Sequence, residues 1–291
     1  MDARLQELIS NQLSTDKVKF TPIGGGSINE TFRIDSSGPK FFCKINSARK
    51  FPGLFEKERN GLEFLRKANT TKVPEVTWCG TFDDKQVLIL EWIEQGRRTT
   101  SFWKEFGEQL AALHHMSSDG DRRTTYGLSE DNYMGALPQT NTPSKNWVEF
   151  FINCRLQLQL KLALEGNLIP KKDVDQFNLL YKKLDDLFPV EPPASLHGDL
   201  WSGNYLCDKN GEPVLIDPAV YFGHRSMDLG MTKLFGGFEE EFYSAYHYHF
   251  PFPDNFEEQA EICNLYPLLI HLNLFGSSYL SSIRGILKRY I

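Results

Sequence analysis

Three polar side chains in one stretch of the sequence could act together in phosphate chemistry. Asp199, Asn204 and Asp217 lie in LHGDLWSGNYLCDKNGEPVLID, with intervals of five and thirteen residues between them. A carboxylate and an amide oxygen placed together suit a hard cation such as Mg²⁺. A second carboxylate nearby can accept or orient the proton of an attacking hydroxyl. Phosphoryl transfer uses this combination, although each residue taken alone could simply cap a turn.

The segment between Asn204 and Asp217 predicts how these residues are positioned. Asn210-Gly211 is a strong signal for a hairpin turn. The short strands on either side are then Tyr205 to Cys207 and Val214 to Ile216. Such a hairpin folds the segment back, so we expect Asn204 and Asp217 to lie side by side at the open end of the hairpin.

A glycine run near the N-terminus is a second candidate site. Gly24, Gly25, Gly26 and Ser27 stand between two strand-like runs. Glycines let a backbone approach phosphates closely and offer N–H donors, although such a run is often only a flexible turn. The run is neither a GxxxxGK[ST] loop nor a complete GxGxxG motif, and a strand follows it, which disfavours dinucleotide binding.

Lys44 and Glu58 form a possible charged pair. Lys44 lies in the strand-like run FFCKI, and Glu58 lies on the helical stretch that follows. A Lys–Glu pair positions nucleotide phosphates in kinases. The alternatives are an edge-strand lysine and a solvated helix face. In a two-lobed kinase, Glu91, Trp92 and Ile93 would form the hinge whose backbone binds adenine.

The elements around these residues change character near residue 93. A short helix, strands and one main helix (55–67) precede it, and helical patterns dominate after it, with predicted helices at 147–165, 173–188 and 256–291. Residues 246–252 are expected to form a packed loop, and His114 and His115 to be structural. We predict an α+β architecture with two domains, a small antiparallel-sheet lobe at 1–93 and a larger, mostly helical lobe at 94–291.

Composition excludes several classes of protein. The 32 basic and 38 acidic residues give a net charge of −6, which argues against a nucleic-acid binder with a basic face. The five cysteines contain no CxxC pair, so neither a disulfide framework nor a cysteine-based zinc site is expected. The start of the sequence lacks a signal-peptide pattern, and no apolar run is long enough to span a membrane. We expect a cytoplasmic protein.

These residues together resemble the fructosamine/ketosamine-3-kinase family, within the wider aminoglycoside phosphotransferase and choline kinase group. The resemblance covers nearly the whole chain. It rests on five segments: GGGSIN (24–29), FFCKIN (41–46), HGDLWSGN (197–204), PVLIDPAVYFGHRSMDLGMTKLFGGF (213–238) and HLNLFG (271–276). HGDxxxxN marks only the wider group, whereas HGDLWSGN followed by IDPAVYFGHR is more specific.

The resemblance implies a protein-kinase-like fold and an ATP-dependent kinase. Its substrate would be the O3 hydroxyl of fructosamines or related ketosamines, free or on proteins, and its role would be deglycation. It implies that Asp199 is the catalytic base, that Asn204 and Asp217 bind Mg²⁺, and that Trp201 is a stacking wall for substrate or an ordinary packing residue. The nucleotide-binding residues would be Gly24, Gly25, Gly26, Ser27, Lys44, Glu58, Glu91, Trp92 and Ile93.

The resemblance also suggests supporting and regulatory features. His224 and Asp228 are expected to support the loop at Asp217. Ser27 stands where several eukaryotic relatives carry a redox-active cysteine, so that regulation is not expected. DPA follows at 217–219 in place of DFG, which counts against a protein kinase with an activation loop.

Two alternatives stay open on the sequence. One is a small-molecule kinase of the same fold that acts on an aminoglycoside, choline or a sugar. The other is an inactive ATP-binding module, against which the intact Lys44, Asp199, Asn204 and Asp217 argue. A monomer is favoured, and the sequence does not identify which ketosamine is the substrate.

Overall fold

The computed structural model describes residues 3–15, 18–24, 28–116 and 124–291. Its contacts divide the chain into two compact units. The first unit contains Met1–Thr99 together with Leu206–Asp217, and the second contains Thr100–Tyr205 together with Pro218–Ile291. The hairpin segment that ends at Asp217 therefore belongs to the first unit, although it lies far along the chain.

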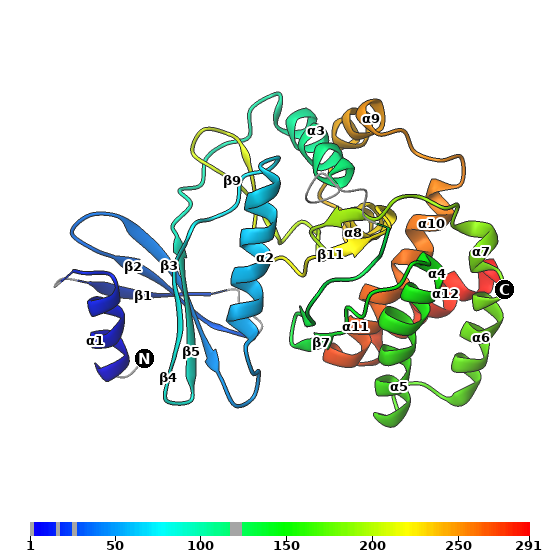
Figure 1. Ribbon diagram of the computed structural model, residues 1–291, viewed down its shortest axis with the longest axis horizontal. Coiled ribbons are helices and arrows are strands. Elements are labelled where there is room, and N and C mark those ends of the chain that lie inside the picture. The colour runs from blue at the N-terminus through cyan, green and yellow to red at the C-terminus, as the bar shows by residue number, and fades with distance from the viewer. Residues whose placement is uncertain (1–2, 16–17, 25–27, 117–123) are drawn as a thin grey trace. The chain divides into compact units, whose positions relative to one another are not determined.

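The first unit is built on a five-stranded antiparallel sheet with the strand order β1-β2-β3-β5-β4 (Figure 1). Its strands are β1 (Lys19–Ile23), β2 (Glu30–Asp35), β3 (Lys40–Ser47), β4 (Val76–Phe82) and β5 (Lys85–Glu91), and its helices are α1 (Ala3–Gln12) and α2 (Leu54–Ala68). The predicted antiparallel sheet is confirmed, and the main helix predicted at 55–67 agrees with α2 within one residue at each end.

A different helix packs on each face of this sheet, and Figure 1 shows the two helices on opposite sides of it. Cys43 and Ile45 of β3 pack in one core cluster with Leu5 and Ile9 of α1. Because successive strand residues point to opposite faces, Lys44 points to the other face, which α2 covers. β3 lies between β2 and β5, so the edge-strand interpretation of Lys44 is wrong.

A short hairpin completes the first unit. β9 (Tyr205–Cys207) pairs with β10 (Pro213–Leu215), and Gly211 in the turn has a φ of +84°, which favours glycine. The predicted hairpin is confirmed. Asp208 fixes the turn, because its side chain accepts hydrogen bonds from the backbone N–H groups of Asn210 (2.8 Å) and Glu212 (3.0 Å).

The same hairpin is joined to the body of the first unit. The carboxylate of Asp208 is buried and pairs with the Lys72 ammonium at 2.7 Å. The backbone N–H of Leu215 donates to the Lys72 carbonyl at 2.9 Å, and the Gly96 N–H donates to the Cys207 carbonyl at 3.0 Å. These bonds hold the strand that leads to Asp217.

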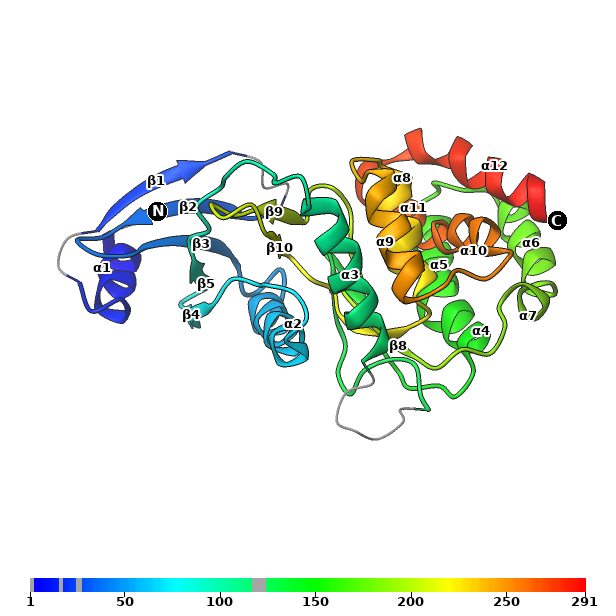
Figure 2. The same cartoon turned by 90° about the horizontal axis from the view of Figure 1, so that it is seen from above.

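The second unit is mostly helical (Figure 2). Its helices are α3 (Phe102–His115), α4 (Trp147–Phe150), a π-helical turn (Phe151–Leu156), α5 (Gln157–Glu165), α6 (Lys171–Tyr181), α7 (Leu184–Leu187), α8 (Ser226–Leu234), α9 (Glu240–His249), α10 (Phe256–Cys263), α11 (Leu265–Phe275), a 3₁₀ turn (Ser277–Tyr279) and α12 (Leu280–Tyr290). Its strands form two pairs, β6 (Asn132–Met134) with β7 (Leu137–Gln139) and β8 (Ala194–Leu196) with β11 (Tyr221–Gly223).

Two expectations for the second unit are wrong in detail. The single helix expected at 173–188 is divided into α6 and α7 by a turn at residues 182–183. The loop expected at 246–252 begins as helix, because α9 runs to His249 and buries Tyr246. In both segments, tertiary packing decides the outcome rather than the local pattern.

We predict that Asp208→Ala lowers the free energy of unfolding by about 2–3 kcal/mol, because two backbone N–H groups and Lys72 lose a buried acceptor. Lys72→Met should cost less than about 1 kcal/mol, since it removes the half-exposed end of the ion pair. Lys209→Met, at an exposed neighbouring lysine, is the matched control. Chemical denaturation measures all three, and equal losses for Lys72→Met and Asp208→Ala would contradict this assignment.

Candidate active site

The candidate site residues of the first unit centre on a buried lysine. Lys44 is 3% exposed, and its ammonium lies 2.8 Å from a Glu58 carboxylate oxygen and 2.6 Å from an Asp217 carboxylate oxygen. The predicted Lys44–Glu58 pair is thus present, and it contains Asp217 as a third member. β3, α2 and the end of the hairpin each supply one residue.

The charges of this cluster depend on one another. Burial alone would lower the pKa of Lys44, but the carboxylates of Asp217 and Glu58 outweigh burial and raise it. Burial raises the pKa of Glu58, and the neighbouring Lys44 ammonium opposes that rise. Lys44 therefore stays protonated at neutral pH, and an ammonium with three N–H donors keeps one for an anionic ligand beside its two carboxylate partners.

Asp217 has a constrained backbone conformation. Its φ is +53°, in the left-handed region that residues other than glycine seldom adopt. Its side chain is 44% exposed while one of its oxygens binds Lys44. The carboxylate can thus reach a ligand and keep its bond to the lysine.

The predicted adenine-binding segment is partly used by the sheet itself. The N–H of Glu91 donates to the Glu75 carbonyl (2.8 Å), and that of Trp92 donates to the Lys40 carbonyl (3.3 Å). Among the described residues, the backbone N–H of Ile93 has no hydrogen-bond partner. Ile93 is therefore the member of this segment whose N–H is available to a base.

The glycine run lies mostly outside the described residues. Gly25, Gly26 and Ser27 are in the part of the chain that the structure does not describe, and Gly24 follows directly after β1. A Cβ added at Gly24 would meet no atom within 4 Å, so packing within the described residues does not require glycine there.

The candidate site residues of the second unit lie in the loop after β8. The side-chain N–H₂ of Asn204 donates to the Asp199 carboxylate (2.9 Å) and to the Asp199 carbonyl (2.8 Å). Asn204 is buried and Asp199 is partly exposed. The predicted base and the predicted metal-binding amide are therefore in direct contact.

The buried side chain of Asp228 holds this loop through its backbone. Its two carboxylate oxygens accept hydrogen bonds from the backbone N–H groups of His197 (2.7 Å) and Gly198 (2.8 Å). Gly198 has a φ of +84°, and a Cβ there would lie 2.1 Å from the Ala219 carbonyl oxygen. Only glycine allows this close approach directly before Asp199.

These bonds correct the expected role of Asp228 and His224. Asp228 supports the loop that carries Asp199, not the loop at Asp217. The side chain of His224 lies elsewhere: its Nδ1 accepts from the Ser226 N–H (3.3 Å), and its ring packs against Trp147 and Phe188. Sequence reasoning missed the target of Asp228 because the contact depends on pairing between β8 and β11.

His114 is the other buried partner of Asp228. Its Nε2 lies 3.2 Å from Asp228, and its Nδ1 lies 2.8 Å from the Tyr246 hydroxyl. Burial lowers the pKa of His114, and Asp228 opposes that effect. The structural role expected for His114 is therefore confirmed, and the signal for it was its place on the apolar face of α3.

Each unit offers an oxygen donor of its own. Because the Asn204 N–H₂ group donates to Asp199, its amide oxygen is the atom left for a cation. In the first unit, Asp217 presents a half-exposed carboxylate. These are hard oxygen ligands of the kind that Mg²⁺ prefers. The described residues contain no cluster of three or more His, Cys, Asp or Glu that could hold a metal ion.

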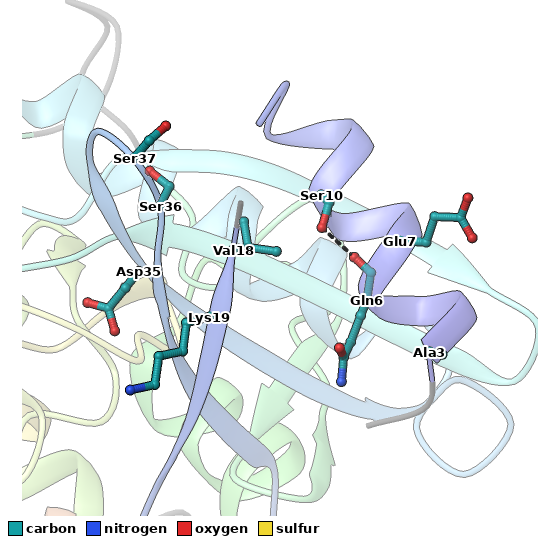
Figure 3. A pocket seen from close by; sticks show the side chains of 9 residues that line it. All are labelled: Ala3, Gln6, Glu7, Ser10, Val18, Lys19, Asp35, Ser36 and Ser37. Atoms are coloured by element: carbon teal, nitrogen blue, oxygen red, sulfur yellow. Dashed lines mark hydrogen bonds between the residues drawn. The ribbon is translucent and has the colours of Figure 1, made fainter. Parts of the chain in front are cut away.

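A separate open pocket of about 650 Å³ lies in the first unit, beside α1, β1 and the turn after β2 (Figure 3). Its lining includes Lys19, Asp35 and Glu7, with Glu7 pointing away from the other two. None of the candidate site residues lines it, and its charges are of both signs. We assign no catalytic role to it.

Solved structures define the class of this protein. A fructosamine-3-kinase structure, so named, from Haemophilus somnus superposes with a TM-score of 0.87 at 26% identity, covering 99% of this chain and 96% of that one. A choline kinase from Streptococcus pneumoniae gives a TM-score of 0.61 at 17% identity, covering 98% of each chain. The fold is thus protein-kinase-like, as predicted.

The family follows from the sequence comparisons. The model of the family described as fructosamine kinase matches residues 1–291, and the chain belongs to that family of kinases. A ketoamine kinase, so named, from Enterococcus faecium is 37% identical, covering 94% of this chain and 95% of the relative. The protein-ribulosamine 3-kinase of Arabidopsis thaliana is 36% identical, covering 98% and 86%. No helix among the described residues is long and apolar enough to cross a membrane.

Asp228→Asn should destabilise the protein by about 3 kcal/mol, because the amide places an N–H₂ group against one of the two backbone donors. Thermal or chemical denaturation measures the loss. Asp175→Asn makes the same change at an exposed position on α6 and should be neutral. An Asp228→Asn protein as stable as the parent would show that these two bonds do not order the loop.

The buried side chain of His224 makes the stability of the protein depend on pH. Burial lowers the pKa of His224 to about 4 from 6.5, so the unfolded chain binds more protons than the folded one between these values. Stability is then complete above pH ~6.5 and is lost as pH falls toward ~4, by up to about 1.4 kcal/mol per pH unit.

His224→Asn tests this assignment, because asparagine keeps an acceptor for the Ser226 N–H and does not titrate. Denaturation curves between pH 4 and 7 should show a shallower pH dependence for His224→Asn than for the parent. His115→Asn, on the exposed side of α3, controls for the loss of a histidine. Identical slopes for the parent and His224→Asn would contradict the assignment.

Proposed function

We propose that this protein is an ATP-dependent kinase that phosphorylates the O3 hydroxyl of ketosamines, which are fructosyl or ribulosyl adducts of amines. The observation that carries the kinase chemistry is the buried Lys44 ammonium held by Glu58 and Asp217. The ketosamine substrate comes from the family and from relatives named ketoamine kinase and ribulosamine 3-kinase. The biological role would be deglycation of free or protein-bound adducts.

The site residues have separate roles in this proposal. Asp199 accepts the proton of the O3 hydroxyl while O3 forms a bond to the γ-phosphorus of ATP. The bond from that phosphorus to the bridging oxygen breaks, and ADP leaves with the electron pair. Lys44, positioned by Glu58, binds phosphate oxygens.

The metal and the nucleotide use further residues. Asn204 and Asp217 would hold Mg²⁺, which neutralises charge that develops on the phosphate oxygens. Ile93 would donate its N–H to adenine, beside Glu91 and Trp92, and the run Gly24, Gly25, Gly26 and Ser27 would lie over the phosphates. Residues 1–93 would form the nucleotide-binding lobe and residues 94–291 the catalytic and substrate lobe. The monomeric state and cytoplasmic location stay predictions.

The alternatives are less well supported. Aminoglycoside and choline kinases share the fold at less than 20% identity, which carries no substrate assignment. An inactive ATP-binding module would have no need of the Asp199–Asn204 contact or of the paired Lys44.

The proposed substrate is tested by ATP consumption with Mg²⁺ against fructosyl-lysine, ribulosyl-lysine, an aminoglycoside and choline. Turnover is expected with the two ketosamines alone, and their relative rates would indicate the preferred sugar. Turnover with only an aminoglycoside or choline would keep the kinase chemistry and refute the ketosamine substrate. ATP binding without turnover on any of the four would favour the inactive module.

The proposed base is tested by Asp199→Asn. The amide cannot accept the proton, so kcat should fall by about 10²–10⁴-fold, while ATP affinity, measured by calorimetry, should stay within about threefold of the parent. Asp175→Asn should leave both quantities unchanged. An Asp199→Asn enzyme with the parent kcat would refute the assignment.

A further inference from the structure

A row of aromatic rings in the second unit begins next to the proposed base. Trp201 contacts Phe235 (ring centroids 6.0 Å apart), and Phe235 contacts His271 (5.0 Å). His271 in turn contacts Phe275 (5.5 Å) and Tyr279 (5.0 Å). We call these five residues the aromatic row. It joins the loop after β8, the end of α8, α11 and the following 3₁₀ turn.

Local backbone features hold the row together. A Cβ at Gly203 would lie 2.4 Å from the Trp201 indole, so the ring rests directly on the glycine. Phe235 ends α8, and Gly236 and Gly237 follow it with φ values of +68° and +91°. These left-handed residues turn the chain immediately after Phe235. His271 and Phe275 are four residues apart on α11 and therefore share one of its faces.

Three rings of the row are exposed, whereas Tyr279 packs against the core of the second unit. Phe275 is 54% exposed, Phe235 is 39% and Trp201 is 38%. Aromatic side chains that serve only packing are normally more buried than this. Among the described residues, no lysine or arginine lies over these five rings, so no cation of the described chain competes for them.

His271 adds a hydrogen-bond acceptor to the row. Its Nδ1 lies 2.7 Å from the Pro267 carbonyl oxygen, to which it can only donate. Burial lowers the pKa of His271, so the ring is neutral and Nε2 is an acceptor. Within the described residues, Nε2 has no hydrogen-bond partner.

We propose that the aromatic row binds the amine side of the acceptor substrate, in which a secondary ammonium group joins the sugar to its carrier. Aromatic faces attract cations, and His271 Nε2 accepts one ammonium N–H. Trp201 stacks on the sugar, two residues from Asp199 on the same loop. The inference rests on the proposed function and deepens it: the row selects acceptors that carry a positive charge beside the ketose.

The loop geometry supports continuity between the base and the row. The Trp201 N–H donates to the Asp199 carbonyl (3.2 Å), and the Trp201 carbonyl accepts from the Asn204 N–H (2.9 Å). The first ring of the row is therefore tied by its backbone to both proposed catalytic-loop residues. The proposal places the amine substituent of a substrate held at Asp199 against this ring.

The test compares two acceptors that differ in one atom: fructosyl-lysine and its ether analogue, in which oxygen replaces the amine nitrogen attached to the sugar. The parent enzyme should prefer the amine in kcat/KM. Phe275→Leu should raise the KM for the amine by about 3- to 30-fold, change the KM for the ether and for ATP by less than twofold, and leave kcat unchanged. Phe275→Tyr, which keeps a ring, should retain the preference.

Two further variants complete the experiment. Tyr248→Leu removes an aromatic side chain that is 82% exposed and outside the row, and it should leave all constants unchanged. His271→Asn keeps a group able to donate to Pro267 but removes the Nε2 acceptor, so it too should reduce the preference for the amine.

The outcomes separate the two proposals. If the parent enzyme prefers the amine, and both Phe275→Leu and His271→Asn keep that preference, the role of the row is overturned and the proposed function stays intact. If the variants lose as much kcat/KM with the ether as with the amine, recognition of the positive charge is likewise refuted. A parent enzyme with no turnover on fructosyl-lysine or ribulosyl-lysine would overturn both proposals.

Discussion

The first unit depends on how one buried ammonium is neutralised. A buried lysine without a partner would lose its proton, and Lys44 keeps its charge because Glu58 and Asp217 lie within 2.8 Å and 2.6 Å. These three residues come from β3, α2 and the end of the β9–β10 hairpin. Their contact therefore requires that the helix, the sheet and a hairpin from much later in the chain are correctly packed. Asp208 and Lys72 secure the hairpin independently, so Asp217 does not rely on Lys44 alone.

The second unit uses a buried anion for a comparable purpose. The buried carboxylate of Asp228 needs hydrogen-bond partners, because an unsatisfied buried carboxylate is strongly unfavourable. It takes two backbone N–H groups from residues 197 and 198 and contacts His114. The loop that carries Asp199 is thereby fixed through its backbone, which leaves the Asp199 side chain to contact Asn204. In both units a buried charge orders the backbone, and the more exposed carboxylate is the one able to meet a ligand.

Features of the structure that depend on neighbouring residues could be predicted from the sequence. Asn210-Gly211 predicts its hairpin because few other dipeptides adopt that turn, and the order of Lys44 and Glu58 along a strand and a helix predicts their pair. The partners of Asp228 could not be predicted, because they depend on which strands pair across about 30 residues of chain. The apolar pattern that predicts one helix over 173–188 is continuous across 182–183, where the chain forms a turn between α6 and α7. The links between Asp208 and Lys72 are equally long-range and had no local signal.

The arrangement separates phosphate chemistry from acceptor choice. Lys44, Asp199, Asn204 and Asp217 would serve any acceptor hydroxyl, so they cannot distinguish a ketosamine from another alcohol. Trp201 is poorly placed to vary, because its backbone is bonded to Asp199 and Asn204 and its ring rests on Gly203. Within the described residues, no backbone hydrogen bond joins Phe235, Phe275 or Tyr279 to this loop. Changes at these three positions would alter which amine is accepted while the base keeps its geometry, so acceptor specificity in this protein is expected to reside at the end of α8 and along α11 rather than in the catalytic loop.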